Sequence, residues 1–247
     1  MMLDISLIGY GKMGRMLQEL ASSHGCRVHS IVDPLQEGCL KEIDGKQLAA
    51  VCIDFSHPSA VLDNLRKLAA AKRDIVVGTT GWNDHLDEVR ALAEDNGIGI
   101  LWGANFSIGM NIFNRVTQFA TALCDKFPQY DIYGFELHHN QKADSPSGTA
   151  IQLAQTILGQ SSRKTKAVYD KLDRRIEPDE LHFASVRAGS IPGTHTVGFD
   201  SLSDTIELIH RVRSRACFAQ GALEAAKWIA GRKGLYSFNQ MMEERLC

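Results

Sequence analysis

The stretch ELHHNQKADSPSGTA, residues 136–150, gathers groups that transfer protons beside groups that bind anions. Histidine titrates near neutral pH, and a lysine beside an anionic substrate stabilises developing negative charge and can act as an acid. A backbone N–H and two hydroxyls at the start of a helix form a site for a carboxylate. The proton-transfer candidates are His138, His139 and Lys142, and the anion-binding candidates are Ser147, Gly148 and Thr149.

Simpler roles exist for some of these residues. Ser147 can serve as the N-cap of a helix, and a single histidine at a strand end is more often structural than catalytic. Paired histidines also bind metals, but we find no Glu or Cys at a matching spacing and predict no metal site. Adjacent histidines on a strand point to opposite faces, so both can serve one site only if the strand has already ended.

A second motif, GYGKMG, fits the pattern G-x-G-x-x-G and lies between a predicted strand and a predicted helix. Its first glycine makes a tight turn, its second lets a pyrophosphate approach the backbone, and its third lets helix and strand pack closely. The candidate cofactor-binding residues of this loop are Gly9, Tyr10, Gly11, Lys12, Met13 and Gly14.

Asp33 adds to this pattern. It ends the second predicted strand about 20 residues past the loop, where an acid can bond a ribose 2′-OH. The alternative is that Asp33 only starts a turn with Pro34. Because an acid repels a 2′-phosphate while Lys12 and Arg15 can offset that repulsion, we expect NADH or NADPH to bind, with a slight preference for NADH.

Two further turns follow the fourth and fifth predicted strands. Ligands of open α/β sheets bind outside the carboxyl ends of the strands, so both turns can line the nicotinamide side of a cofactor. The alternative is ordinary turn chemistry, since Gly, Thr and Asn are common in turns. The candidates in these turns are Gly78, Thr79, Thr80, Gly103, Ala104, Asn105 and Phe106.

The order of predicted elements indicates two domains. Up to about residue 106, apolar strands alternate with helices, which predicts an α/β fold with a Rossmann-type, doubly wound parallel sheet. Within it, Pro58 is expected in the first turn of a helix over 57–71. The second domain is expected to be α+β with a mixed or antiparallel sheet, and its polar segment 160–180 to be a mobile loop. The predicted domains are 1–106, completed by the helical segment 216–247, and 107–215.

Composition narrows the function classes. The chain has 247 residues, 44% hydrophobic and 23% charged, with a formal net charge of −2, so neither nucleic acid nor an anionic membrane is an expected partner. No apolar run approaches the roughly 20 residues that span a bilayer, and the N-terminus does not read as a signal peptide. The six cysteines form no CxxC pair, which favours a reducing cytoplasm over disulfides or a zinc site.

The chain resembles the dihydrodipicolinate reductase family over nearly its whole length. ELHHNQKADSPSGTA is similar to that family's E-x-H-H-x-x-K-x-D-x-P-S-G-T-A signature, and further landmarks match in order: GYGKMGR, VVGTTGW, ANFSIGMN and VRAGSIPGTHTVGF. Pro34 and Gly103 depart from the family pattern, and the first loop is shorter. The resemblance implies a homotetramer built through the sheet of the second domain.

The resemblance also implies a reaction. NADH or NADPH would reduce 4-hydroxy-2,3,4,5-tetrahydrodipicolinate, a small cyclic dicarboxylate of the diaminopimelate route to lysine, with loss of water. His138 would be the acid–base residue and Lys142 a second proton donor. His139, with Ser147, Gly148 and Thr149, would hold a carboxylate. Closure of one domain on the other would exclude water.

Two rival functions make different demands on the sequence. A semialdehyde dehydrogenase needs a cysteine nucleophile, but Cys124 and Cys217 fall within predicted helices and lack a glycine-rich elbow. A non-catalytic dinucleotide sensor would use the first domain but would have no need for His138 and Lys142.

Overall fold

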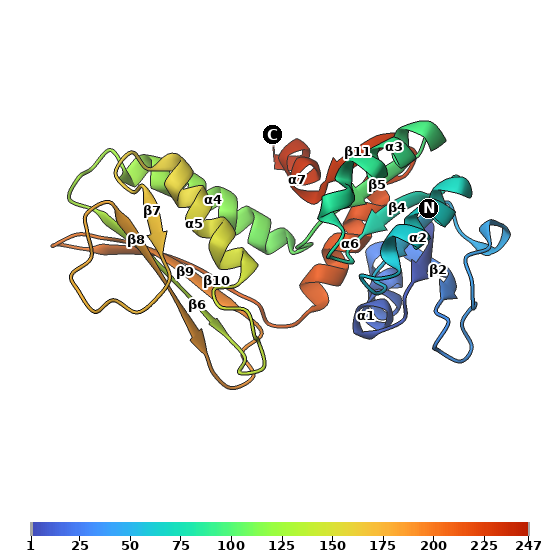
Figure 1. Cartoon of the computed structure of the whole chain (residues 1–247), viewed down its shortest axis with the longest axis horizontal. Helices are drawn as coiled ribbons and strands as arrows, with labels where there is room; N and C mark the ends of the chain where they lie inside the picture. Colours follow the sequence, from blue (N-terminus) through green and yellow to red (C-terminus); the bar gives the residue numbers. More distant parts are fainter. Residues whose placement is uncertain (1, 247) are drawn as a thin grey trace. The chain divides into compact units, whose positions relative to one another are not determined.

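The computed structural model describes residues 2–246, so Met1 and Cys247 lie outside it. The chain divides into two compact units (Figure 1). One comprises Met1–Ile108 with Ala216–Cys247, and the other Gly109–Arg215. The parallel sheet of the first unit and the mixed sheet of the second confirm the predicted fold class.

The first unit contains a six-stranded sheet in the order β11-β5-β4-β3-β1-β2, with every neighbouring pair parallel. Successive strands run outward from β1 in both directions, so the carboxyl ends of β1 and β3 form the point where ligands of such sheets bind. The strands are β1 (Leu3–Ile8), β2 (Cys26–Val32), β3 (Val51–Asp54), β4 (Asp74–Val77), β5 (Gly99–Trp102) and β11 (Gly234–Ser237).

Helices cover both faces of this sheet, which is why its central strands are apolar on both sides. One core packs α1, α6 and α7 against the sheet, and the other packs α2 and α3. The helices are α1 (Lys12–Ala21), α2 (Val61–Ala70), α3 (Leu86–Asn96), α6 (Ala216–Ile229) and α7 (Phe238–Leu246), with short 3-10 turns at Ser22–His24, Gly45–Gln47 and Asn83–His85.

Two local predictions for this unit are wrong. Helix α2 begins at Val61, so Pro58 lies before the helix, in a turn closed by the bond from Ala60 N to His57 O. The segment 216–247 is not helical throughout, because β11 interrupts it and pairs in parallel with β5.

The second unit contains a five-stranded mixed sheet in the order β10-β9-β6-β8-β7. Strand β6 is antiparallel to β9 and parallel to β8. Helices α4 (Ile108–Cys124) and α5 (Gly148–Gln160) pack on one face of this sheet (Figure 1). The strands are β6 (Asp131–His138), β7 (Lys166–Val168), β8 (Glu180–Arg187), β9 (Thr194–Asp200) and β10 (Thr205–Arg211).

The predicted mobile loop over 160–180 is wrong in part. Strand β7 lies within it and pairs with β8. Lys164, only 3% exposed, anchors the segment because its Nζ donates to the carbonyls of Pro178 and Glu180 at 3.0 and 2.8 Å. A polar, basic composition therefore did not exclude an ordered edge strand.

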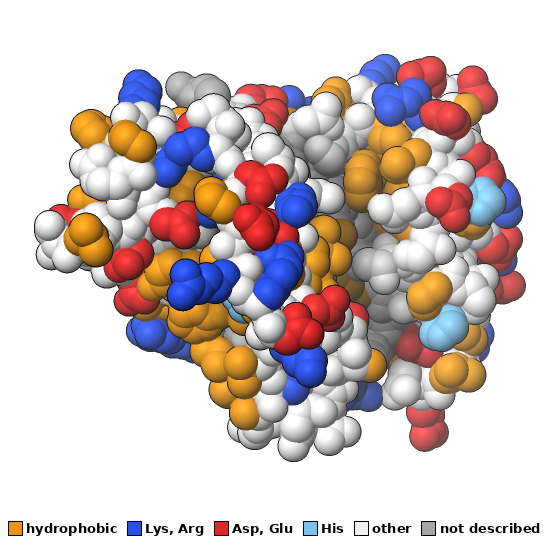
Figure 2. All heavy atoms as spheres, turned by 60° about the vertical axis from the view of Figure 1, so that its left-hand side comes forward, with side chains coloured by type: hydrophobic (Ala, Val, Ile, Leu, Met, Phe, Trp, Pro, Cys, Tyr) orange, Lys and Arg blue, Asp and Glu red, His pale blue; other side chains and the backbone are white. Residues whose placement is uncertain are grey.

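Surface charge agrees with the small net charge of the sequence. Figure 2 shows Lys and Arg side chains interspersed with Asp and Glu over the face in view, without a large area of one sign. Among residues 2–246, no helix is long and apolar enough to cross a membrane.

Candidate active site

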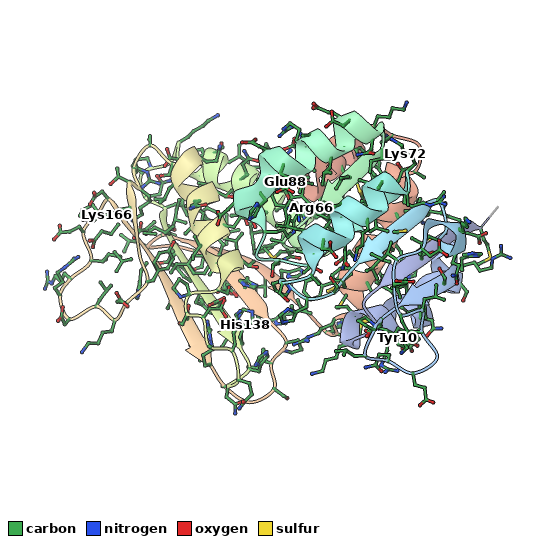
Figure 3. The ribbon with its side chains drawn as sticks, turned by 45° about the vertical axis from the view of Figure 1, so that its right-hand side comes forward. Tyr10, Arg66, Lys72, Glu88, His138 and Lys166 are labelled. Carbon is green, nitrogen blue, oxygen red and sulfur yellow. The ribbon has the colours of Figure 1, made fainter. Side chains whose placement is uncertain are left out.

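The glycine loop lies directly after β1 and opens α1 (Figure 3 labels Tyr10). Gly9 has φ +91°, and a Cβ there would lie 2.6 Å from the carbonyl oxygen of Phe55. A Cβ at Gly14 would lie 2.3 Å from the carbonyl oxygen of Gly9, whereas the space beside Gly11 is open. Gly11 caps α1 without a side-chain hydrogen bond, so the helix start presents bare backbone. This geometry fits a pyrophosphate.

Asp33 follows β2 and braces this loop. Its Oδ2 accepts a hydrogen bond from Tyr10 N at 2.8 Å, and its Oδ1 accepts one from Leu35 N at 2.9 Å. Asp33 can therefore either bond a ribose 2′-OH or only stabilise the turn with Pro34, because its carboxylate supports that turn and also lies beside the glycine loop. Arg15 reaches the same segment, with its Nη2 2.8 Å from Oε1 of Gln36 and its guanidinium over the Tyr10 ring.

The turn after β4 is held by a buried carboxylate that the sequence analysis missed. Asp54, at the end of β3, accepts a hydrogen bond from Thr79 Oγ1 at 2.6 Å and others from Ser56 and Asn64. Burial raises the pKa of Asp54, and these donors act against that rise. Trp82 Nε1 donates to the Thr79 carbonyl at 2.8 Å. The Thr79 side chain thus points inward, whereas Thr80 is exposed.

The turn after β5 contains one buried side chain, Phe106, and one exposed residue, Ala104. Phe106 is 2% exposed, and its ring packs against those of Phe55 and Phe238. Asn105 Oδ1 accepts a hydrogen bond from Ser107 N at 2.9 Å, while Ala104 is exposed. Phe106 therefore supports the turn from within the core, and Ala104 is the exposed residue of this turn.

The crowded loop of the second unit begins where β6 ends, at His138 (labelled in Figure 3). His139 lies outside the strand, so strict alternation does not force the two rings onto opposite faces. Lys142 lies farther along, where its Nζ donates to both carboxylate oxygens of Asp144 at 2.7 and 2.8 Å. Asp144 was not among the predicted site residues.

Glu136 is the centre of this site, and it too was missed. Its carboxylate is fully buried and accepts hydrogen bonds from Ser147 N, Ser185 Oγ and Arg187 Nη2, each at 2.9 Å, and from Ser147 Oγ. Burial alone would raise the pKa of Glu136, but the surrounding donors hold it well below its usual range. The residue is therefore a charged carboxylate within the unit.

Ser147 joins this carboxylate to α5. Its Oγ accepts a hydrogen bond from Ala150 N at 3.1 Å, which makes Ser147 the N-cap of the helix. Because its N–H and Oγ–H both donate to Glu136, Ser147 has little left to offer a ligand directly. Gly148 is exposed and Thr149 half-buried at the same helix start.

Two imidazoles flank the second oxygen of Glu136. Oε2 lies 3.2 Å from Nδ1 of His138 and 3.4 Å from Nε2 of His195. The two rings meet edge to face with centroids 5.2 Å apart. Burial lowers the pKa of His138 to about 4, although Glu136 acts in the opposite direction. His138 is therefore neutral at pH 7 in the free protein.

The carboxylate and the two imidazoles also form a set of metal-ligand type, with donor atoms within 4.8 Å of one another. The Glu136 carboxylate already has a counter-charge, because Arg187 Nη2 lies 2.9 Å from Oε1. A divalent cation would have to bind beside this guanidinium. The arrangement thus fits the orientation of imidazole rings better than it fits a metal.

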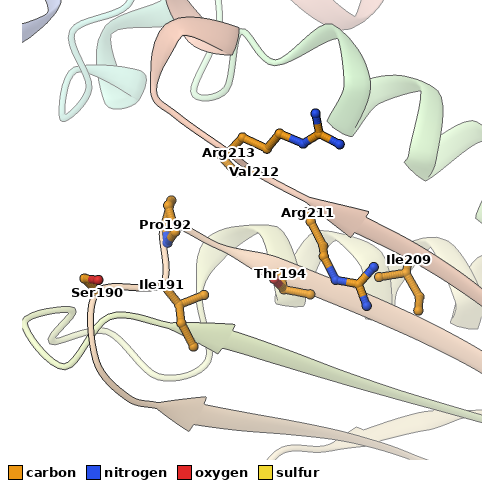
Figure 4. A pocket seen from close by; sticks show the side chains of 8 residues that line it. All are labelled: Ser190, Ile191, Pro192, Thr194, Ile209, Arg211, Val212 and Arg213. Carbon is orange, nitrogen blue, oxygen red and sulfur yellow. The ribbon is translucent and has the colours of Figure 1, made fainter.

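A loop over residues 188–193 passes beside the His138 ring. Gly193 has φ +153°, and a Cβ there would lie 3.1 Å from His138 Nε2. The loop is tied to β6 by the bond from Ala188 N to His138 O at 2.8 Å. It also borders a pocket of about 560 Å³, lined by residues that include Ser190, Pro192, Arg211 and Arg213 (Figure 4). Two arginines make this pocket suited to anions.

Comparison with known proteins gives consistent results over the whole chain. The family described as "Dihydrodipicolinate reductase, N-terminus" matches residues 3–106, and "Dihydrodipicolinate reductase, C-terminus" matches residues 109–242. The chain is 34% identical over 246 residues, 98% of each chain, to 4-hydroxy-tetrahydrodipicolinate reductase of Christiangramia forsetii. It is 34% identical over 265 residues, 97% of each chain, to the protein of that name from Neisseria meningitidis.

Solved structures show the same fold. Dipicolinate-bound dihydrodipicolinate reductase from Paenisporosarcina sp. TG-14 superimposes with a TM-score of 0.76 at 22% identity, covering 98% of this chain and 100% of that one. This likeness shows that the two chains share one fold.

Proposed function

The chain belongs to the dihydrodipicolinate reductase family and is a nicotinamide-dependent reductase of lysine biosynthesis, and we propose how its own residues carry out the reaction. Its substrate is 4-hydroxy-2,3,4,5-tetrahydrodipicolinate, which loses water and is reduced to 2,3,4,5-tetrahydrodipicolinate. The observation that best supports the proposal is the buried Glu136, which joins a proton-transfer histidine to the start of α5.

The substrate carboxylate is held at the N-terminus of α5. The exposed backbone of Gly148 and the N–H and hydroxyl of Thr149 lie in the first turn, where the helix dipole favours an anion. His139 follows β6 and adds a donor. Ser147 supports this clamp from behind, since Glu136 engages its polar groups. We therefore propose that Ser147 supports the residues that bind the substrate, whereas the sequence predicted that Ser147 contacts the substrate directly.

His138 supplies the acid–base function only once substrate has bound. Because the pKa of His138 is about 4 in the free protein, its imidazole lacks the proton that it would donate at neutral pH. A bound dicarboxylate brings two negative charges, which favour the protonated imidazole. His138 then takes up a proton as the substrate binds and returns it to the ring as negative charge develops there.

Lys142 provides positive charge to the same reaction. Its present partner is Asp144 in its own loop, and its side chain is 23% exposed. A substrate carboxylate would compete with Asp144 for the ammonium group. We propose that Lys142 turns from Asp144 toward the substrate and donates a proton or a compact charge to the ring.

The first unit binds the nucleotide through the glycine loop. The tight turn at Gly9, the open backbone of Gly11 and the uncapped start of α1 fit a dinucleotide, which supplies hydride when it is bound. Asp33 favours a ribose 2′-OH, and hence NADH, whereas Arg15 lies close enough to the same segment to favour a 2′-phosphate. We expect both nucleotides to be used, with a slight preference for NADH.

We further propose a cytoplasmic homotetramer formed through the mixed sheet. Helices α4 and α5 pack on one face, while the opposite face carries apolar side chains such as Val186 and Ile209, 45% and 39% exposed. A second copy would bury these groups. Light scattering of Val186→Glu beside the unchanged protein tests this proposal, since loss of the tetramer is expected.

The reductase activity is tested by a coupled assay. Substrate is generated with a dihydrodipicolinate synthase, and oxidation of NADH and of NADPH is followed in separate reactions. Oxidation that depends on the synthase supports the proposal. Nucleotide binding without any turnover would identify the chain as a dinucleotide sensor.

A further inference from the structure

Glu136 has an environment that the fold alone does not require. Transfer of a carboxylate out of water is costly, and a buried ion pair is often no more stable than a well-packed apolar substitute. Yet Glu136 is fully buried on β6 with its charge retained. Its neighbours come from both adjacent strands and from the loop before α5.

The two oxygens of Glu136 have different surroundings. Oε1 accepts hydrogen bonds from Ser147 N, Ser185 Oγ and Arg187 Nη2, which fix the loop before α5 to the sheet. The same Arg187 Nη2 donates to the Asp144 carbonyl at 2.6 Å, so the crowded loop is tied to the carboxylate twice. Oε1 is thus an anchor for the backbone around the site.

Oε2 accepts a hydrogen bond from Ser147 Oγ and also faces the two imidazoles. It lies 3.2 Å from His138 Nδ1, on the same face of β6, because residues two apart on a strand point the same way. The other nitrogen of this ring, Nε2, is directed toward Gly193 at the edge of the site. The carboxylate therefore stands behind the ring and leaves Nε2 free to meet a substrate.

We propose that Glu136 is a positioning residue, which holds the Nδ1 side of His138 and the N-terminus of α5 in one fixed relation. A single carboxylate thereby aligns the proton donor with the carboxylate clamp. The expected effect of Glu136 on kcat rests on the proposed function. Its expected effect on the tautomer and orientation of the His138 ring does not.

The charge of Glu136 favours Nδ1 as the protonated nitrogen of the neutral His138 ring. Burial, His195, Lys142 and Arg187 all lower the pKa of His138, and Glu136 alone among the principal contributors raises it. The neutral ring keeps one proton, and the carboxylate at 3.2 Å attracts it to Nδ1. In this structure Nδ1 is not aligned for a hydrogen bond, so a small rotation of the ring accompanies formation of that bond.

His195, which is buried, and His210, which is half-buried, extend the same row across the sheet. His210 pairs with His195 across β10 and β9, and His195 pairs with Glu136 across β9 and β6. The His195 ring nitrogens have no hydrogen-bond partner although the residue is 3% exposed. Among the principal charged neighbours of His138, Glu136 is the one carboxylate.

A matched control comes from Glu180 on β8. It is 1% exposed and pairs with Arg174 at 2.6 Å and Lys166 at 3.1 Å, so it is also a buried, ion-paired glutamate of the second unit. These partners, together with Glu177 N, lie outside residues 136–150. Glu136→Gln and Glu180→Gln thus remove similar charges, but only the first removes the partner of His138.

The test combines NMR of ¹⁵N-labelled histidine with steady-state kinetics, and His138→Gln assigns the His138 signals. In the unchanged protein we expect the Nδ1–H tautomer of neutral His138. In Glu136→Gln we expect the His138 titration to move to lower pH and kcat to fall about 10²-fold, as for a misplaced catalytic group. Glu180→Gln should leave the tautomer and the titration unchanged and retain near-normal kcat.

Each result has a defined meaning. An Nε2–H tautomer in the unchanged protein, or equal kcat in the two glutamine variants, would overturn the positioning role. If the unchanged protein does not reduce the substrate, the proposed function fails, but the tautomer and titration still decide whether Glu136 orients His138. If Glu136→Gln does not fold, the tautomer of the unchanged protein decides alone.

Discussion

The low pKa of His138 predicts that acid destabilises the second unit in a defined pH window. Unfolded, this histidine takes up its proton near pH 6.5, whereas in the folded chain the pKa is lowered to about 4 by burial. The unfolded state therefore binds the proton first as pH falls. Stability from this group is fully present above about pH 6.5 and is lost between pH 6.5 and pH 4.

The magnitude follows from the gap between these two values. At about 1.4 kcal/mol for each unit of pKa difference, protonation of His138 lowers the free energy of unfolding by about 3 kcal/mol between pH 6.5 and pH 4. The side chain is only 11% exposed, so solvent screening reduces this contribution little. His138→Gln cannot take up the proton and should lose this part of the pH dependence.

Hydrogen exchange along β6 measures the effect where it arises, because all three tryptophans, Trp82, Trp102 and Trp228, lie in the other unit. Protection of β6 amides should fall more steeply between pH 6.5 and pH 4 in the unchanged protein than in His138→Gln. His57→Gln, an exposed histidine of the first unit, serves as the control. Parallel pH profiles for the unchanged protein and His138→Gln would refute the buried, neutral imidazole.

Substitutions at four residues test individual roles in the coupled assay. His138→Gln should lower kcat about 10²- to 10⁴-fold with little effect on nucleotide affinity, and near-normal kcat would remove it from the mechanism. Thr149→Val should raise KM about 10- to 150-fold by removing one hydrogen bond to a charged group, whereas a fall in thermal stability alone would indicate a purely structural role. Asp33→Ala should weaken the binding of NADH and leave the binding of NADPH unchanged or stronger. Equal losses of affinity for both nucleotides would mean that Asp33 only braces Tyr10 and Leu35. If Lys142 donates a proton, Lys142→Arg should show most of the fall in kcat that Lys142→Ala shows, because arginine keeps its proton. Full activity in Lys142→Ala would contradict any role of Lys142 in the reaction.

The alternation of strands and helices could be predicted because each central strand of a parallel sheet is apolar on both faces. VCID and DIVV show this pattern, and both are strands. GLYS, the sequence of β11, lacks it, because this edge strand is half-buried and is defined by its pairing with β5. Local sequence does not contain that partner, so the last strand was missed.

The same limit applies to the second unit. The segment with β7 is short, polar and basic, and its order depends on pairing with β8 and on the buried Lys164. The sequence shows that lysine as one basic residue among several. Its burial follows from two carbonyl acceptors that belong to a later part of the chain.

The sequence predicted some residues of the candidate site but not Glu136. His138, Lys142 and the start of α5 were predicted as site residues because they lie within one stretch of sequence. Glu136 lies in that stretch as well, two residues before His138, and strand periodicity places the two on one face. It was not among the predicted residues because no local feature shows that the carboxylate is fully buried.

The partners of Glu136 explain why that burial could not be predicted. Arg187 and His195 are 51 and 59 positions farther along the chain, and they reach the carboxylate only because β6 lies between β8 and β9. Strand order is a property of the folded sheet, and the parallel pairing of β6 with β8 sets Arg187 opposite His138. The signature motif thus places the candidate proton-transfer residues and the proposed carboxylate clamp in one loop, while the buried charge of Glu136 is stabilised by residues from two other strands. For this reason Glu136, more than either catalytic candidate, depends on the integrity of the whole mixed sheet.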